Sequence, residues 1–73
     1  MLQHKHAEAA EHYQEVLRLN PNDPRAHQGL GNALAEQGKL DEAIQQFTEA
    51  LRLRPDYPEA RRQLESLSTR TGH

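Results

Sequence analysis

The chain has 73 residues, which is enough for one small domain with a thin hydrophobic core. Eleven acidic residues stand against nine basic ones, and this near balance argues against a dedicated nucleic-acid or membrane surface, because either needs a basic excess. There is no cysteine for a disulfide or a thiolate zinc site, and no apolar run approaches the roughly 20 residues of a membrane span. Since the N-terminus also lacks the apolar segment of a signal peptide, a cytoplasmic location is our default expectation.

Proline and glycine divide the chain into four segments of helical length. Each segment carries apolar residues at the spacing of an amphipathic helix, and valine and isoleucine occur once each, which argues against strands. We expect helices over residues 6–19, 24–37, 40–53 and 58–70. The short connections between them predict that neighbouring helices pack antiparallel.

The first predicted helix carries two patterns. Ala9, Tyr13 and Val16 form an apolar stripe at positions i, i+4 and i+7, which Leu2 extends. A second face carries His4, Glu8 and His12 at a spacing that can chelate a metal ion. We interpret this second set as solvated side chains in a fraying first turn, and we predict no metal site and no cofactor.

Capping residues mark the ends of the other helices. Asp23 is a favourable N-cap, and Pro24 occupies the first helical position, where its missing N–H costs no hydrogen bond. Gly38 predicts a left-handed residue that ends the second helix. The fourth helix has Tyr57 in the capping place, which is a poorer choice.

An internal repeat is the most informative feature of the chain. Residues 12–30 recur 34 residues later as residues 46–64, with eight identities in nineteen positions and no gap. The identical pairs are Glu15/Glu49, Leu17/Leu51, Arg18/Arg52, Leu19/Leu53, Pro21/Pro55, Pro24/Pro58, Ala26/Ala60 and Leu30/Leu64. A fixed period of 34 residues is the signature of a solenoid of stacked helix pairs.

These residues resemble the tetratricopeptide repeat family, whose pattern is W-x2-L-G-x2-Y, then A-x3-F, then a closing proline. The matching residues of this chain are Leu30, Gly31, Ala43, Phe47 and Pro55, and Ala50 also fits the family. Two positions depart from the pattern, because His27 stands where tryptophan is common and Leu34 where tyrosine is common. We expect His27 to give a less filled contact.

The resemblance implies an all-α fold: a short right-handed superhelical solenoid of antiparallel helix pairs, with four helices in one domain over residues 1–73. Residues 1–23 are expected to be a half-unit helix, 24–57 the full repeat and 58–73 a capping helix. The small side chain of Gly31 would let two helices approach closely, and Tyr13 and Leu51 would bridge adjacent pairs. Six residues are expected to hold the fold: Leu30, Gly31, Ala43, Phe47, Ala50 and Pro55.

The resemblance also implies a non-catalytic protein–protein interaction module. Its members bind peptides in a groove lined by the first helix of each pair, which gives Arg25, Gln28, Asn32, Glu36 and Arg62 as groove candidates, together with Gly29, Ala35, Glu59, Gln63 and Ser66. The basic clamp with which some members hold an acidic chaperone tail is missing here. Isolated solvated polar residues are the alternative interpretation of the groove positions. No nucleophile–base pair and no phosphate-binding loop occurs, so we predict no catalytic residue and no enzyme.

The two ends of the predicted solenoid differ. Glu65 stands where the full unit has Gly31. We interpret the last helix as a solvating cap, and the alternative is that a following helix has been cut away. At the other end, Ala9, Tyr13 and Val16 should face a helix that the chain lacks. We therefore expect a homodimer through this stripe, with a monomer, or a first helix that bends over the stripe, as the alternatives.

Two other function classes stay open from the sequence. The chain could be a recruiting or regulatory segment of a larger enzyme such as a glycosyltransferase, which similar repeats often precede. It could also be an engineered repeat unit. RNA binding by a related helical repeat fits less well, because the period is 34 and the groove positions are not systematically basic. A protein or peptide partner, and neither nucleic acid nor membrane, is our expectation.

Overall fold

The computed structural model describes residues 2–70, with side chains from Lys5 to Thr69. Its elements are α1 (Leu2–Leu19), α2 (Pro24–Glu36), α3 (Leu40–Leu53) and α4 (Pro58–Arg70). No strand occurs between residues 2 and 70. The predicted all-α fold with four helices is confirmed; α1 begins four residues earlier than the expected residue 6, and α2 ends at residue 36 rather than 37.

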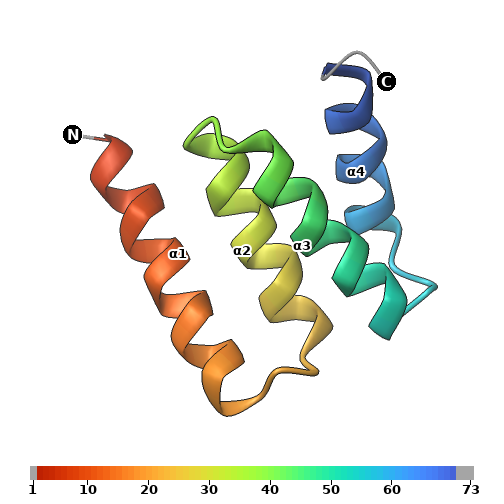
Figure 1. Cartoon of the computed structure of the whole chain (residues 1–73), viewed down its shortest axis with the longest axis horizontal. Helices are drawn as coiled ribbons and strands as arrows, with labels where there is room; N and C mark the ends of the chain where they lie inside the picture. Colours follow the sequence, from red (N-terminus) through yellow and green to blue (C-terminus); the bar gives the residue numbers. More distant parts are fainter. Residues whose placement is uncertain (1, 71–73) are drawn as a thin grey trace.

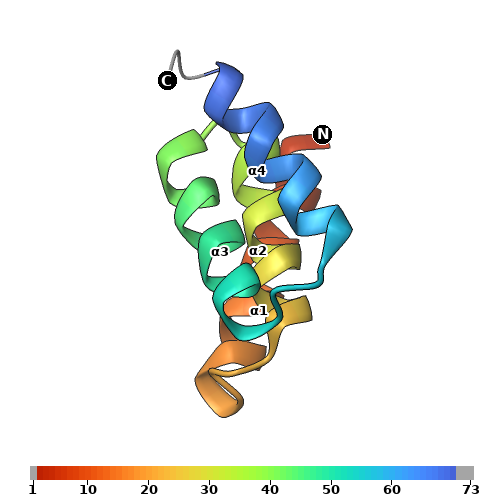
Figure 2. The same cartoon turned by 90° about the vertical axis from the view of Figure 1, so that its right-hand side faces the viewer.

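The helices alternate in direction, so the start of α1 and the end of α4 lie at the same end of the molecule (Figure 1). α1, α2 and α3 stand side by side in chain order, and each packs on the next. α4 packs on α3 and also lies beside α2, so that it contacts both helices of the full unit (Figure 2). Consequently α1 has a helix on one side only.

The helix ends form where the capping residues predict. The Asp23 side chain accepts a hydrogen bond from the Arg25 amide at 3.0 Å, and Pro24 follows in the first turn. Gly38 has φ +83°, a left-handed conformation in which its amide donates to the Ala35 carbonyl at 3.0 Å. The amide of Lys39 then donates to the Leu34 carbonyl at 2.9 Å. These local bonds end α2 and turn the chain into α3.

The core lies between α2, α3 and α4, and Phe47 is at its centre with 1% of its surface exposed. A Cβ atom at Gly31 would lie only 2.9 Å from the Phe47 ring, so that the absence of a side chain there lets α2 and α3 cross closely. The other buried apolar side chains are Ala10, Ala26, Leu30, Ala33, Leu34, Ala43, Ala50, Tyr57, Ala60 and Leu67. Pro55 is exposed in the α3–α4 turn.

His27 makes two polar contacts at the position where the family pattern has tryptophan. Its Nδ1 lies 2.8 Å from Oε1 of Gln46 on α3, and its Nε2 lies 2.9 Å from the Pro21 carbonyl in the α1–α2 turn. Both ring nitrogens are therefore in hydrogen-bond contact. His27 thus places two polar contacts where the family pattern has apolar bulk, and the expectation of a less filled contact stays a prediction.

Tyr57 is a core residue as well as the residue before α4. Only 7% of its surface is exposed, and the Arg54 guanidinium lies 5.1 Å from the centre of its ring. The Tyr57 carbonyl accepts the Arg61 amide at 3.1 Å, which begins the first turn of α4. Its side chain thus anchors α4 by packing, which compensates for the missing side-chain cap.

Candidate functional site

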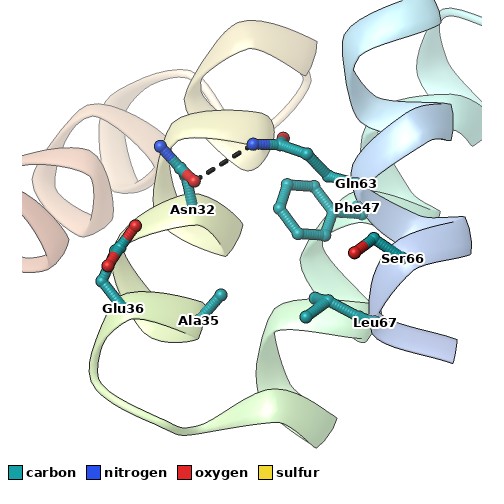
Figure 3. Close-up of a pocket in the computed structure, with 7 residues that line it drawn as sticks. All are labelled: Asn32, Ala35, Glu36, Phe47, Gln63, Ser66 and Leu67. Atoms are coloured by element: carbon teal, nitrogen blue, oxygen red, sulfur yellow. Dashed lines mark hydrogen bonds between the residues drawn. The ribbon is translucent and has the colours of Figure 1, made fainter. Parts of the chain in front are cut away.

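A groove opens between α2 and α4, with α3 beneath it. These two helices are the 34-residue counterparts of one another, so the groove lies between equivalent helices of successive units. It encloses about 400 Å³. The residues that line it are Asn32, Ala35 and Glu36 from α2, Phe47 from α3, and Gln63, Ser66 and Leu67 from α4 (Figure 3).

A chain of side-chain amides fixes the polar rim of this groove. Gln28 on α2 donates through Nε2 to Oε1 of Gln63 on α4 at 2.8 Å. Gln63 in turn donates through Nε2 to Oδ1 of Asn32 at 3.1 Å (Figure 3). Because each amide is oriented by the one before it, the Nδ2 donor of Asn32 ends the chain with a defined direction. The groove therefore offers a pre-oriented amide rather than a freely rotating one.

The rest of the groove lining is apolar at its floor and polar or acidic at its rim. Phe47 and Leu67 form an apolar floor, and Ser66 points its hydroxyl toward the opening (Figure 3). Glu36 is exposed at the end of α2 and places a carboxylate at the rim. The arrangement combines hydrogen-bonding groups, one acid and a small apolar surface, which suits a peptide segment better than a compact cofactor.

The structure brings together only part of the predicted groove set. Asn32 and Glu36 line the groove as expected, whereas Gln28 lines a second depression and reaches the rim through its hydrogen bond to Gln63. Arg25 also lines this second depression, near the start of α2, and Arg62 is exposed on α4 without lining either depression. These positions do not test which residues bind a ligand.

One part of the groove was missed by the sequence. Leu67 closes the apolar floor, although its counterpart 34 residues earlier is the small, buried Ala33. The difference in size between these two residues was the only available signal.

Gly29 was expected to face the groove, and this was wrong. A Cβ atom on Gly29 would lie 2.6 and 2.7 Å from Cε1 and Cε2 of Tyr13, so the tyrosine ring covers this glycine. The Tyr13 ring lies against α2 and bridges α1 to the next pair, as the sequence predicted, while the residue itself stays half-buried. Whether Tyr13 takes part in self-association is not tested by this geometry.

The far side of α1 is nevertheless less covered than the equivalent side of α3. Residues 34 apart can be compared directly. In each of the pairs Ala9/Ala43, Tyr13/Phe47 and Val16/Ala50, the residue on α1 is half-buried and its counterpart on α3 is buried. His12 is exposed, and Leu19 is 73% exposed, whereas its counterpart Leu53 is half-buried. We call the surface of Ala9, His12, Val16 and Leu19 the open α1 face. On α3, the equivalent side is covered by α2.

With this geometry in place, comparison with known proteins identifies the family. A family model described as a tetratricopeptide repeat matches residues 3–58, which is most of the chain. The chain belongs to the tetratricopeptide repeat family. A search of the curated proteins found no match.

The tetratricopeptide-repeat match fits about one unit with flanking helices, and the family consists generally of protein–protein interaction modules. No described helix is long and apolar enough to cross a membrane. Among the described side chains, no group of three metal-ligating residues converges; His4 of the sequence pattern lies outside them.

Proposed function

We propose that this chain is a non-catalytic interaction module that binds an extended peptide in the groove between α2 and α4. The observation that carries the proposal is the amide chain from Gln28 through Gln63 to Asn32, which presents an oriented donor at the rim. A peptide backbone offers a carbonyl at every residue, and an asparagine amide can both donate to it and accept from the next amide. Hydrogen bonds of this kind recognise a main chain irrespective of its side chains.

The surroundings of the amides define which peptides fit. The apolar floor of Phe47 and Leu67 accommodates one aliphatic or aromatic side chain of a ligand. The Glu36 carboxylate favours a lysine or arginine one or two residues away, by charge attraction at the exposed rim. We therefore expect short ligands with an apolar residue next to a basic one, bound weakly because the groove is short.

Selection from a displayed random-peptide library, followed by titration of the selected peptides, tests this proposal. Asn32→Ala should weaken the selected peptides about tenfold, because a buried hydrogen bond in a complex contributes on the order of 1–1.5 kcal/mol. Gln45→Ala is the matched control, since Gln45 is an exposed amide on α3 outside the groove. Side-chain amide signals of Asn32 and Gln63 should move in NMR spectra on addition of peptide. Selected peptides that move neither signal would rule out this groove as the site.

We propose self-association through the open α1 face as a second function, in the form of a homodimer. Leu19 supports it, because this large apolar side chain has 73% exposure and lies one turn from the half-buried Val16. At about 25 cal/mol per Å2, covering some 150 Å2 of such surface would contribute roughly 4 kcal/mol per copy before the entropy of association. A small domain with a thin core gains proportionally from such burial.

The solution mass measured by light scattering over a concentration series tests the homodimer. Leu19→Glu should yield a monomer at concentrations where the unmodified chain is a dimer, and it should fold normally because Leu19 is exposed. Gln14→Glu introduces the same charge at an exposed position on another side of α1 and should leave the dimer intact. A monomer at every concentration for the unmodified chain would reject self-association and leave the groove proposal untouched.

A further inference from the structure

The contact between α2 and α3 is an internal template for how a helix docks on the open α1 face. In that contact His27 of α2 reaches Gln46 of α3, and Gly31 of α2 lies under the Phe47 ring. The counterpart of α2 lies 34 residues later in the sequence and is α4. The counterpart of α3 lies 34 residues earlier and is α1. The template thus describes how α4 of one copy would dock on α1 of a second copy.

The template aligns the polar partners of such a contact. Arg61 is the counterpart of His27, and it is held in the same way, with Nη2 donating to the Pro55 carbonyl at 3.4 Å where His27 contacts the Pro21 carbonyl. Arg61 of one copy would therefore approach His12 of the next, the counterpart of Gln46.

Charge also favours this docking. The hydrogen bond from Arg52 lowers the pKa of Glu49, and the nearby His27 adds a smaller effect in the same direction. The counterpart of Glu49 is Glu15, which pairs with Arg18 as Glu49 pairs with Arg52. Docking of α4 would bring the full positive charge of Arg61 toward Glu15 of the second copy, so the two surfaces attract one another.

One residue opposes the contact. The counterpart of Gly31 is Glu65, and its ring partner on the second copy would be Tyr13, the counterpart of Phe47. A Cβ atom added at Gly31 would lie only 2.9–3.0 Å from three Phe47 ring atoms, well inside ordinary carbon contact. A whole glutamate side chain has no room there, and its carboxylate would be desolvated against an aromatic ring.

We propose that Glu65 prevents α4 of one copy from docking on the open α1 face of another, and so keeps copies from stacking head to tail. A contact of this kind joins two different surfaces, so it does not close on itself and propagates into an open filament. A homodimer formed by two open α1 faces is closed and is compatible with Glu65. The inference depends on the open α1 face and goes beyond the proposed peptide site.

Replacement of Glu65 tests this inference on the intact chain, with weight-average mass measured by light scattering from micromolar to near-millimolar concentration. Glu65→Gly should assemble progressively, to roughly threefold the monomer mass or more at the highest concentration, as an open contact requires. Glu65→Gln keeps the bulk and loses the charge, and should stay at the mass of the unmodified chain, which we expect to be a dimer at most. Growth of the unmodified chain beyond a dimer would overturn the proposal.

Two further variants separate specific stacking from unfolding, since glycine weakens a helix by about 1 kcal/mol. Adding His12→Arg to Glu65→Gly places a second cation opposite Arg61 and should restore the mass of the unmodified chain. The same addition at the exposed Gln14, written Gln14→Arg, should not. Assembly that survives His12→Arg would be non-specific and would overturn the inference.

Glu65→Ala replaces Glu65→Gly in the experiment if circular dichroism shows that the glycine variant has lost its helices. Alanine keeps the helix and leaves only the close Cβ contact, so its assembly should be present but weaker. If Glu65→Gly folds and its mass does not increase, the blocking role of Glu65 is rejected. If Glu65→Gly does not fold, the same conclusion follows from an unchanged mass of Glu65→Ala.

Discussion

The contact between Tyr13 and Gly29 gives the sharpest test of how α1 is held. A Cβ atom on Gly29 would lie 2.6–2.7 Å from two carbons of the Tyr13 ring, where ordinary carbon contacts are about 3.5–4.0 Å. The ring, or α1 with it, must retreat by about 1 Å to accept Gly29→Ala. Such overpacking costs about 1–3 kcal/mol, while the gain in helix propensity returns about 1 kcal/mol. We expect a net loss of about 1 kcal/mol in the free energy of unfolding.

A double-mutant cycle isolates this contact from other effects. Tyr13→Ala alone should destabilise the protein by about 2 kcal/mol, since a half-buried aromatic side chain is lost. In that background Gly29→Ala has no ring to meet and should become stabilising by up to about 1 kcal/mol, through helix propensity alone. Urea denaturation of the four proteins measures the coupling. Equal effects of Gly29→Ala in both backgrounds would show that the ring does not cover Gly29.

Three further substitutions test local features of the fold by denaturation. Asp23→Ala removes the side-chain acceptor of the Arg25 amide and should cost about 1 kcal/mol, measured as a lower urea midpoint. Gly38→Ala should also cost about 1 kcal/mol, because its φ of +83° is unfavourable for a residue with a Cβ atom, and Gly38→Asn should cost less. Burial raises the pKa of Tyr57 above its ordinary value, and the Glu59 carboxylate adds to this. A raised pKa stabilises the fold below about pH 10 and is lost as the pH rises through the folded-state value, so Tyr57→Phe should flatten the fall in urea midpoint between pH 9 and 11.

The sequence predicted the helices well because the signals for them are local. Proline and glycine fix the turns, the Asp23 cap needs only the next two residues, and Gly38 ends a helix wherever it adopts the left-handed conformation. The 34-residue period then supplies the antiparallel order, since each helix repeats the environment of its counterpart. None of these inferences depends on the angle at which two helices cross.

The errors arose where that angle matters. Gly29 was assigned to the groove from its position on one helix, but the Tyr13 ring reaches across from α1 and covers it. A stripe read from a single helix gives a direction only to within about the width of an apolar face, roughly 100°. The contacts of His27 could not be predicted for a related reason, because its partners are a backbone carbonyl in a turn and a side chain on α3, both set by tertiary structure.

The same amide chain links ligand binding to the stability of one end of the fold. Gln63 holds α4 against α2 through Gln28 and Asn32, and a peptide that engages Asn32 would bind only while α4 is docked. A ligand selective for this docked state raises its stability by RT ln(1 + [L]/Kd), which is about 1.4 kcal/mol when the ligand is at tenfold its Kd. Hydrogen exchange should therefore slow in α4 when the groove is occupied, whereas a partner on the open α1 face should slow exchange in α1. The two proposed sites lie on opposite terminal helices, so one exchange experiment with a bound partner assigns it to the groove or to the open face.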